Sequence, residues 1–175
     1  MLSLRNFSRL DQSEKKAVNI HEGIESTLLL LNHRLHPKIE IIKKYGNLPP
    51  VQCYPAQLNQ VFMNILSNGI DALLELDNQN QKQILIKTEV TELETVIITF
   101  RDNGDGIDAE IQSKIFDPFF TTKPINKGTG LGLAISHQII QKHQGNIQLK
   151  SEFGYGTEFA LEIPIALAVN HKSDT

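Results

Sequence analysis

The order in which hydrophobic periodicity changes along this chain restricts its fold more than any other feature. Apolar residues recur at helical spacing in three segments, at about 19–35, 56–76 and 133–143. Alternating or short apolar runs predict strands at about 39–43, 83–90, 95–101, 147–149 and 159–163. Strands are grouped in hairpins between helices instead of alternating strictly with them. This predicts an α+β fold, a two-layer sandwich in which a mixed sheet of about five strands packs on about three helices.

Length and composition indicate one ordinary globular domain. The chain has 175 residues, of which 40% are hydrophobic and 21% charged, and these values suit a single compact core. We expect that domain at 17–165. Residues 1–16 are interpreted as the helical remnant of a preceding element, and 166–175 as a frayed tail.

Charge and cysteine content argue against several classes of protein. A formal net charge of −3 provides no basic stripe for nucleic acid. The single cysteine, Cys53, cannot form an internal disulfide or a multi-cysteine zinc site. No apolar run approaches the roughly 20 residues of a spanning helix, and the N-terminus lacks a signal-peptide pattern. We expect a cytoplasmic protein, with any membrane association supplied by a region upstream of this sequence.

The second predicted helix carries a polar ridge. Asn64, Asn68 and Asp71 are spaced i, i+4 and i+7, so they share a face opposite the apolar stripe. A solvated face is the simpler interpretation of such a ridge. Gly69 favours a functional one, because a glycine inside a helix costs about 1 kcal/mol relative to alanine and usually has a packing or ligand reason.

A second candidate site follows the strand at 95–101. Asp102-x-Gly104-x-Gly106 is compatible with an ordinary turn, since Asn-Gly and Asp-Gly are common turn dipeptides. The same spacing also suits a flat ligand. The glycines would let the backbone approach it closely, and the Asp102 carboxylate would accept a hydrogen bond from its amino group.

A third candidate, Gly-Thr-Gly-Leu-Gly-Leu at 128–133, opens the third predicted helix. Backbone N–H groups at a helix N-terminus bind phosphate well, especially where glycine leaves them accessible. No Gly-Lys-Ser/Thr follows, which excludes a Walker A loop. A dinucleotide-binding loop is a weaker alternative: Glu152 lies about 20 residues downstream, but a third glycine would be needed at Leu133, and a preceding strand is missing.

Four motifs in order resemble those of sensor histidine kinases. The stretch 58–72 resembles the N box and Asp102-Asn-Gly-Asp-Gly-Ile107 the G1 box. Phe116-Asp-Pro-Phe-Phe-Thr-Thr-Lys123 resembles the F box, and 128–133 the G2 box. Together they cover the ATP-binding domain of that family, at about residues 18–165. The resemblance implies the Bergerat sandwich, shared with gyrase, mismatch-repair and heat-shock chaperone ATPases.

The resemblance also implies roles for individual residues, with ATP and Mg²⁺ as cofactors. Asn68 matches the asparagine that holds magnesium against the phosphates, and Asp71 shares its face of the site. Asp102 matches the aspartate that binds the adenine amino group, and Thr157 the threonine that reaches adenine through water. Further nucleotide contacts are implied for the two glycine boxes, at Gly104, Gly106, Ile107, Gly128, Thr129, Gly130, Leu131, Gly132 and Leu133.

One position departs from the family pattern, and another differs from that of the hydrolytic relatives. Many members have an arginine where Thr121 stands, so Lys123, or else Lys127, is expected to be the cation that contacts the γ-phosphate. In the hydrolytic relatives that the resemblance suggests, a glutamate acts as general base at the position of Asn64. An amide cannot accept a proton near neutral pH, which predicts a poor ATPase.

The resemblance implies a phosphoacceptor histidine that this chain lacks. His21-Glu22 is superficially similar to the acceptor motif, but no proline follows where expected. Only 43 residues separate His21 from Asn64, too few for the rest of one dimerisation helix, a turn, a second such helix and the start of the ATP-binding domain. His33 and His36 are expected on a helix surface, without a metal. We therefore expect residues 1–16 to end a dimerisation helix. The acceptor domain would be missing or separate, and a response regulator receiver domain would be an indirect partner. Alternatives are an anti-sigma-type serine kinase, a gyrase-like ATPase, or a non-catalytic nucleotide-binding module.

Overall fold

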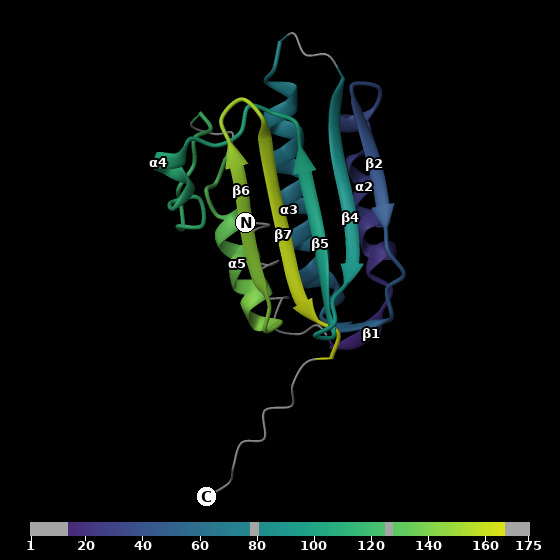
Figure 1. Cartoon of the computed structure of the whole chain (residues 1–175). Coiled ribbons are helices and arrows are strands. Elements are labelled where there is room, and N and C mark those ends of the chain that lie inside the picture. The colour runs from purple at the N-terminus through teal and green to yellow at the C-terminus, as the bar shows by residue number, and fades with distance from the viewer. Residues whose placement is uncertain (1–13, 78–80, 125–127, 167–175) are drawn as a thin grey trace, which may run out of the picture.

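A computed structural model describes residues 14–77, 81–124 and 128–166 and contains one mixed sheet (Figure 1). The sheet has five strands in the order β2-β4-β5-β7-β6. Their bounds are Ile39–Tyr45 for β2, Lys82–Val90 for β4, Thr95–Asp102 for β5, Asn146–Glu152 for β6 and Gly156–Pro164 for β7. β2 pairs parallel with β4, and the other neighbours are antiparallel. The predicted hairpin is confirmed as β4–β5.

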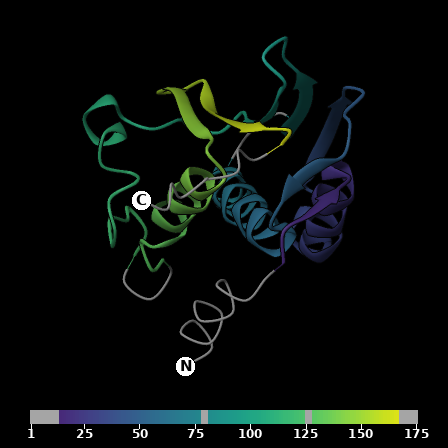
Figure 2. The ribbon, with the colours of Figure 1, turned by 90° about the horizontal axis from the view of Figure 1, so that it is seen from below.

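Three main helices cover one face of this sheet, as the end-on view in Figure 2 shows. They are α2 (Ile20–Leu35), α3 (Pro55–Leu74) and α5 (Gly132–Lys142), and a short α4 (Ala109–Gln112) precedes α5. Helix α3 lies between the other two and contacts both. The predicted two-layer α+β sandwich is therefore confirmed.

Local sequence accounts for the central helix. Pro55 at the first helical position supplies a preset φ, and the apolar stripe of α3 then packs between helices and sheet. Phe62, Leu66, Ile70 and Leu73 on this stripe are each exposed by 1% or less. Because this stripe is buried, the polar ridge lies on the opposite side of the helix.

Alternation along the strands divides the sheet into a packed and an open face. In β6, Ile147, Leu149 and Ser151 are partly buried, whereas Asn146 and Lys150 are exposed. This period-two pattern is typical of an antiparallel sheet covered on one side only. Buried side chains of the helices and of the covered face of the sheet form one hydrophobic cluster in the described part of the chain.

A second, two-stranded sheet was not predicted. It pairs β1 (Lys16–Val18) antiparallel with β3 (Val51–Cys53). Of the predicted helical remnant 1–16, residues 1–13 lie outside the described part of the chain, and Lys16 begins β1. Strands of three residues have too little periodicity to be recognised in a sequence. Of the predicted tail 166–175, only residue 166 is described.

A buried histidine joins the end of α5 to the start of α3. His143 is 1% exposed, and its Nδ1 donates to the Ile139 carbonyl at 2.7 Å. Its Nε2 accepts from the Tyr54 amide at 3.0 Å, so the ring is neutral in this arrangement. Burial lowers the pKa of His143, because the protonated ring would lose its solvation, although the hydrogen bond to the Ile139 carbonyl opposes this.

This arrangement predicts that stability falls in mild acid. A lowered pKa in the folded state means that the unfolded chain binds more protons below about pH 6.5, so stability is present above that value and lost as the pH falls. The thermal midpoint is expected to drop by several degrees between pH 7 and pH 5. Burial also lowers the pKa of His21, so the share of His143 needs its own variant. His143→Gln is expected to be less stable at pH 7 but to lose less on acidification; an unchanged slope would contradict the assignment.

Candidate functional site

The three predicted constellations meet at one cavity of about 660 Å³. Its walls come from α3, the end of β5 and the loop after it, the segment before α5, and the first turn of α5. Thirteen of the predicted site residues line it, namely Asn64, Asn68, Asp71, Asp102, Gly106, Ile107, Lys123, Gly128, Thr129, Gly130, Gly132, Leu133 and Thr157. Gly104 and Leu131 do not. Lys127, the other candidate cation, lies outside the described residues.

A buried carboxylate forms part of the cavity wall. Asp102 ends β5 opposite Thr157 of β7 and is 8% exposed. Its Oδ1 accepts from the Gly104 amide at 2.9 Å. Burial raises the pKa of Asp102, although backbone hydrogen bonds from Gly104 and Thr157 oppose that rise. The result is an acceptor in a poorly solvated wall, able to recognise a hydrogen-bond donor on a ligand.

The glycines near Asp102 fit this wall closely. A Cβ on Gly69 would meet Asp102 Oδ2 at 3.5 Å, and one on Gly104 would meet Asp102 Oδ1 at 2.9 Å. Gly104 therefore lies behind the carboxylate, which explains why it does not line the cavity. Gly106 has φ +79°, and its Cβ would lie 2.2 Å from the Glu152 carbonyl oxygen. No larger residue could hold this turn against β6.

Ser151, which the sequence analysis missed, fixes the loop after β5. Its hydroxyl accepts from the Ile107 amide at 2.7 Å and donates to the Gly156 carbonyl at 3.0 Å. It also contacts the Thr157 hydroxyl at 2.9 Å. This hydroxyl joins β6, β7 and the loop, and it orients the threonine predicted to face a ligand. A lone serine in a short alternating strand carries no local signal of this role.

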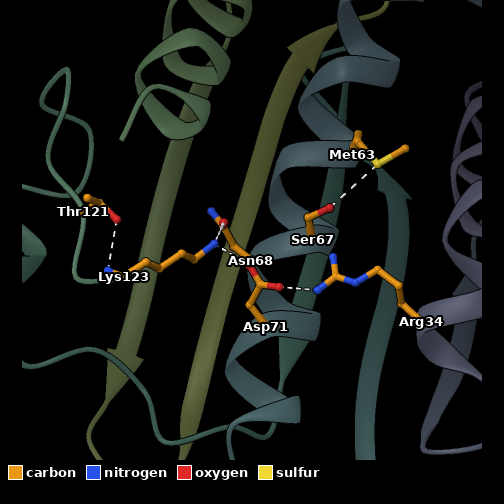
Figure 3. A network of polar contacts seen from close by, with 7 residues as sticks. All are labelled: Arg34, Met63, Ser67, Asn68, Asp71, Thr121 and Lys123. Carbon is orange, nitrogen blue, oxygen red and sulfur yellow. Dashed lines mark hydrogen bonds and ion pairs between the residues drawn. The ribbon is translucent and has the colours of Figure 1, made fainter. Parts of the chain in front are cut away.

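The polar ridge of α3 also lines the cavity. Asn64 Nδ2 donates to the Gly132 carbonyl at 2.9 Å and to the Ser136 hydroxyl at 3.1 Å. Its amide thus ties α3 to the first turn of α5. Asn68 Oδ1 accepts from Lys123 Nζ at 3.3 Å, and Asp71 forms ion pairs with both Lys123 and Arg34 (Figure 3). Lys123 therefore lines the cavity beside Asn68 and Asp71.

The segment before α5 is shaped by close backbone contacts. The Phe119 amide donates to the Gly130 carbonyl at 2.8 Å, and a Cβ on Gly130 would lie 2.4 to 2.6 Å from Phe119 backbone atoms. Gly130 also has φ +68°. By contrast, a Cβ on Gly132 would meet Asn64 at an ordinary 3.5 Å. The Thr121 hydroxyl accepts a hydrogen bond from the Lys123 amide at 3.1 Å.

The family model for the histidine kinase-, DNA gyrase B- and HSP90-like ATPases matches residues 53–167. The chain belongs to this family. The signal transduction histidine-protein kinase AtoS of Escherichia coli K12 is 40% identical over 164 residues, covering 93% of this chain and 26% of AtoS. Sporulation kinase E of Bacillus subtilis is 39% identical over 119 residues, which is 68% of this chain and 15% of that kinase.

Solved structures show the same fold. The catalytic domain of the histidine kinase ThkA is 30% identical with a TM-score of 0.74, covering 87% of this chain and 98% of the ThkA chain. Full-length ShkA in complex with AMPPNP is 26% identical with a TM-score of 0.77, covering 93% of this chain and 34% of ShkA. The chain is therefore a catalytic ATP-binding domain of the two-component sensor histidine kinase type, and ATP is the ligand of this family. It spans only 26% of the length of AtoS and 15% of that of sporulation kinase E.

His33 and His21 make contacts outside the cavity lining. His33 Nδ1 contacts the Leu30 carbonyl at 3.1 Å on exposed α2. His21 stacks on Tyr45, with ring centroids 4.2 Å apart, and its Nε2 contacts the Thr88 hydroxyl at 2.7 Å. Within 14–77, 81–124 and 128–166, no helix is long and apolar enough to cross a membrane. In the same ranges, no group of three His, Cys, Asp or Glu side chains is arranged to hold a metal ion.

Proposed function

We propose that this domain binds Mg-ATP and transfers the γ-phosphate to a histidine on a separate dimerisation and phosphoacceptor domain. A response regulator receiver domain would then take the phosphate from that histidine. One observation carries the proposal: the buried Asp102 carboxylate, the hydrogen-bonded Asn68–Lys123 pair and the glycine segment all line the same cavity. ATP and receiver domains are cytoplasmic reactants, so the proposal includes a cytoplasmic location.

In this proposal Asp102 accepts a hydrogen bond from the adenine amino group, and Thr157 contacts adenine through water. Gly106 and Ile107 form the adjoining wall, with Gly104 behind it. Backbone groups of 128–133 approach the phosphates. Lys123 neutralises charge that develops on the transferred phosphoryl group. Position and charge stabilisation supply most of the catalysis in such transfers.

The side chain of Asn68 suits a magnesium ion bound to the phosphates. Asn68 presents a neutral oxygen in the cavity, and this oxygen already accepts a hydrogen bond from a cation at 3.3 Å. Magnesium prefers oxygen ligands and keeps several waters, so one protein oxygen together with phosphates suits its octahedral shell. We propose that Asn68 holds the ion, which would offset phosphate charge when bound.

Replacing Asn68 with alanine is expected to remove most of the magnesium dependence of ATP binding. Even the loss of a residue that only supports a metal ligand typically costs about 10- to 100-fold in metal affinity, so loss of a direct ligand should cost at least as much. Titration calorimetry with ATP, with magnesium and after chelation, measures this directly in wild type and Asn68→Ala. Asn146→Ala changes an exposed asparagine at the start of β6 and serves as the control. If the wild type bound ATP with the same affinity in the presence of magnesium and after its chelation, the proposed role of Asn68 would be ruled out.

Product chemistry tests the transfer reaction itself. With γ-labelled ATP, the isolated chain is expected to remain unlabelled, because His21 is held by Thr88 and Tyr45 and does not line the cavity. A supplied phosphoacceptor domain is expected to acquire an acid-labile label. Acid-stable phosphoserine would favour the anti-sigma-type kinase, and binding without transfer a regulatory module. Self-labelling lost in His21→Ala would contradict the proposal.

Phosphate release by the chain alone separates a kinase from a gyrase-like ATPase. Asn64 has no proton-accepting capacity, and loss of a general base typically costs about 10² to 10⁴ in rate, so slow hydrolysis is expected. Asn64→Glu is not a simple gain-of-base variant. A carboxylate cannot donate to the Gly132 carbonyl as the amide does, so its thermal midpoint must be measured alongside its turnover. Robust wild-type turnover that disappears in Asp71→Asn would favour the ATPase.

A further inference from the structure

Asp71 is shared between two cations from different parts of the chain. Its Oδ1 pairs with Arg34 Nη2 from the last turn of α2, and its Oδ2 pairs with Lys123 Nζ from the segment before α5. Figure 3 shows the two cations reaching the carboxylate from opposite sides of α3. One carboxylate on the central helix therefore connects α2 to the segment that carries Lys123.

These pairs are more shielded than an ordinary surface ion pair. The side chains of Arg34, Asp71 and Lys123 are 29%, 27% and 28% exposed, whereas the Lys87–Glu89 pair on β4 is 48% and 44% exposed. Burial by itself would raise the pKa of Asp71, but the hydrogen bonds from Lys123 and Arg34 outweigh it and hold the pKa below its usual range. The carboxylate is therefore charged at neutral pH, and screening by solvent is incomplete.

The two cations differ in their relation to the cavity. Lys123, Asn68 and Asp71 line it, and Arg34 does not. Lys123 is therefore the cation that a phosphate in the cavity could take from Asp71, while Arg34 would remain on the far oxygen. An effect of Arg34 on a bound phosphate would have to pass through Asp71.

We propose that Arg34 is a positioning residue that, through Asp71, allows Lys123 to move to the γ-phosphate. This inference rests on the proposed function. With Arg34 present, Asp71 is already half neutralised, so it holds Lys123 less strongly than an unshared carboxylate would. After Lys123 has left, Arg34 still compensates the carboxylate beside the phosphates.

Without Arg34, the same carboxylate acts against the nucleotide in two ways. It retains Lys123, and once Lys123 leaves it stands as an unpaired negative charge next to a triphosphate. Both effects concern the terminal phosphate, so they weaken ATP binding more than ADP binding. Both also disappear when Asp71 is neutralised, which gives the proposal a specific signature.

A double-mutant cycle measures this signature. Affinities for Mg-ATP and Mg-ADP would be compared for wild type, Arg34→Gln, Asp71→Asn and the double variant. Arg34→Gln is expected to weaken ATP binding about tenfold and ADP binding less than about threefold, a coupling in the range found between contacting residues. The double variant is expected to bind ATP about as well as Asp71→Asn alone, and Arg34→Lys to recover most of the affinity. Lys87→Gln breaks the exposed pair on β4 and controls for the change of charge.

The contrary outcomes are distinct. If Arg34 only tethers α2 to α3, Arg34→Gln lowers the thermal midpoint, weakens ATP and ADP equally, and is not rescued by Asp71→Asn; this overturns the inference alone. If Lys87→Gln weakens ATP as much as Arg34→Gln, general charge explains the effect and the inference fails. If wild type and Lys123→Met bind ATP equally well, the proposed role of Lys123 is wrong and the inference falls with it.

Discussion

Replacing Asp102 with asparagine is expected to weaken ATP binding about 100-fold without unfolding the domain. Asp102 is 8% exposed, its Oδ1 accepts a hydrogen bond from the Gly104 amide, and Thr157 lies opposite it on β7. A hydrogen bond to a charged group contributes about 1.5 to 3 kcal/mol, or about 10- to 150-fold in affinity. Asparagine also presents donors of its own, which would face the adenine amino group.

Stability is expected to respond in a different way from affinity. A carboxyl whose pKa is raised by burial costs stability when it is ionised, and that cost is present above the raised pKa and disappears in acid. Asp102→Asn removes the buried charge but also weakens the acceptor for Gly104 and Thr157. These effects oppose each other, so the thermal midpoint at neutral pH should stay within about 3 °C of wild type.

Competition experiments complete this test. GTP should displace a labelled ATP analogue at least about 100-fold less well than ATP, because its six-position carbonyl would face the Asp102 carboxylate, acceptor to acceptor. Asp77→Asn removes an exposed carboxylate outside the cavity and serves as the control. Equal displacement by GTP and ATP would show that Asp102 does not read the base.

Gly130→Val is expected to abolish measurable ATP binding, a loss of more than about 100-fold. Gly130 combines φ +68° with backbone atoms of Phe119 at 2.4 to 2.6 Å from the position of a Cβ. A side chain there must separate the Phe119 amide from the Gly130 carbonyl, and this displaces the segment that carries Lys123. Most of the core lies elsewhere, so circular dichroism should change little.

Two glycine controls separate the possible causes. Gly154→Val imposes comparable strain, since Gly154 has φ +87°, but nothing lies within 4 Å of its Cβ; it should bind ATP normally. Gly132→Ala adds a methyl group at an ordinary 3.5 Å from Asn64 and should retain binding within about fivefold. Normal ATP binding by Gly130→Val would show that the phosphates bind elsewhere. An equal loss of ATP affinity in Gly154→Val would show that backbone strain in general causes the effect.

The sequence determined the elements that depend on local pattern. The stripe that contains Phe62 and Ile70 makes α3 amphipathic, and this alone directs Asn64, Asn68 and Asp71 to one side of it. Glycine at 106 and 130 likewise marks positions with positive φ, since other residues rarely adopt that backbone conformation. Four motifs in order were therefore sufficient for the fold class and for most of the cavity wall.

Only the tertiary structure decided which distant residues complete that wall. Arg34 contacts Asp71 from 37 residues away, and Ser151 holds Ile107 from 44 residues away. The parallel pairing of β2 with β4 and the small β1–β3 sheet are likewise decided by chain packing. An arginine at a helix end or a serine in a strand has the same local sequence whether it faces solvent or a partner. The partner is selected by the free energy of packing the whole chain, which no short segment encodes.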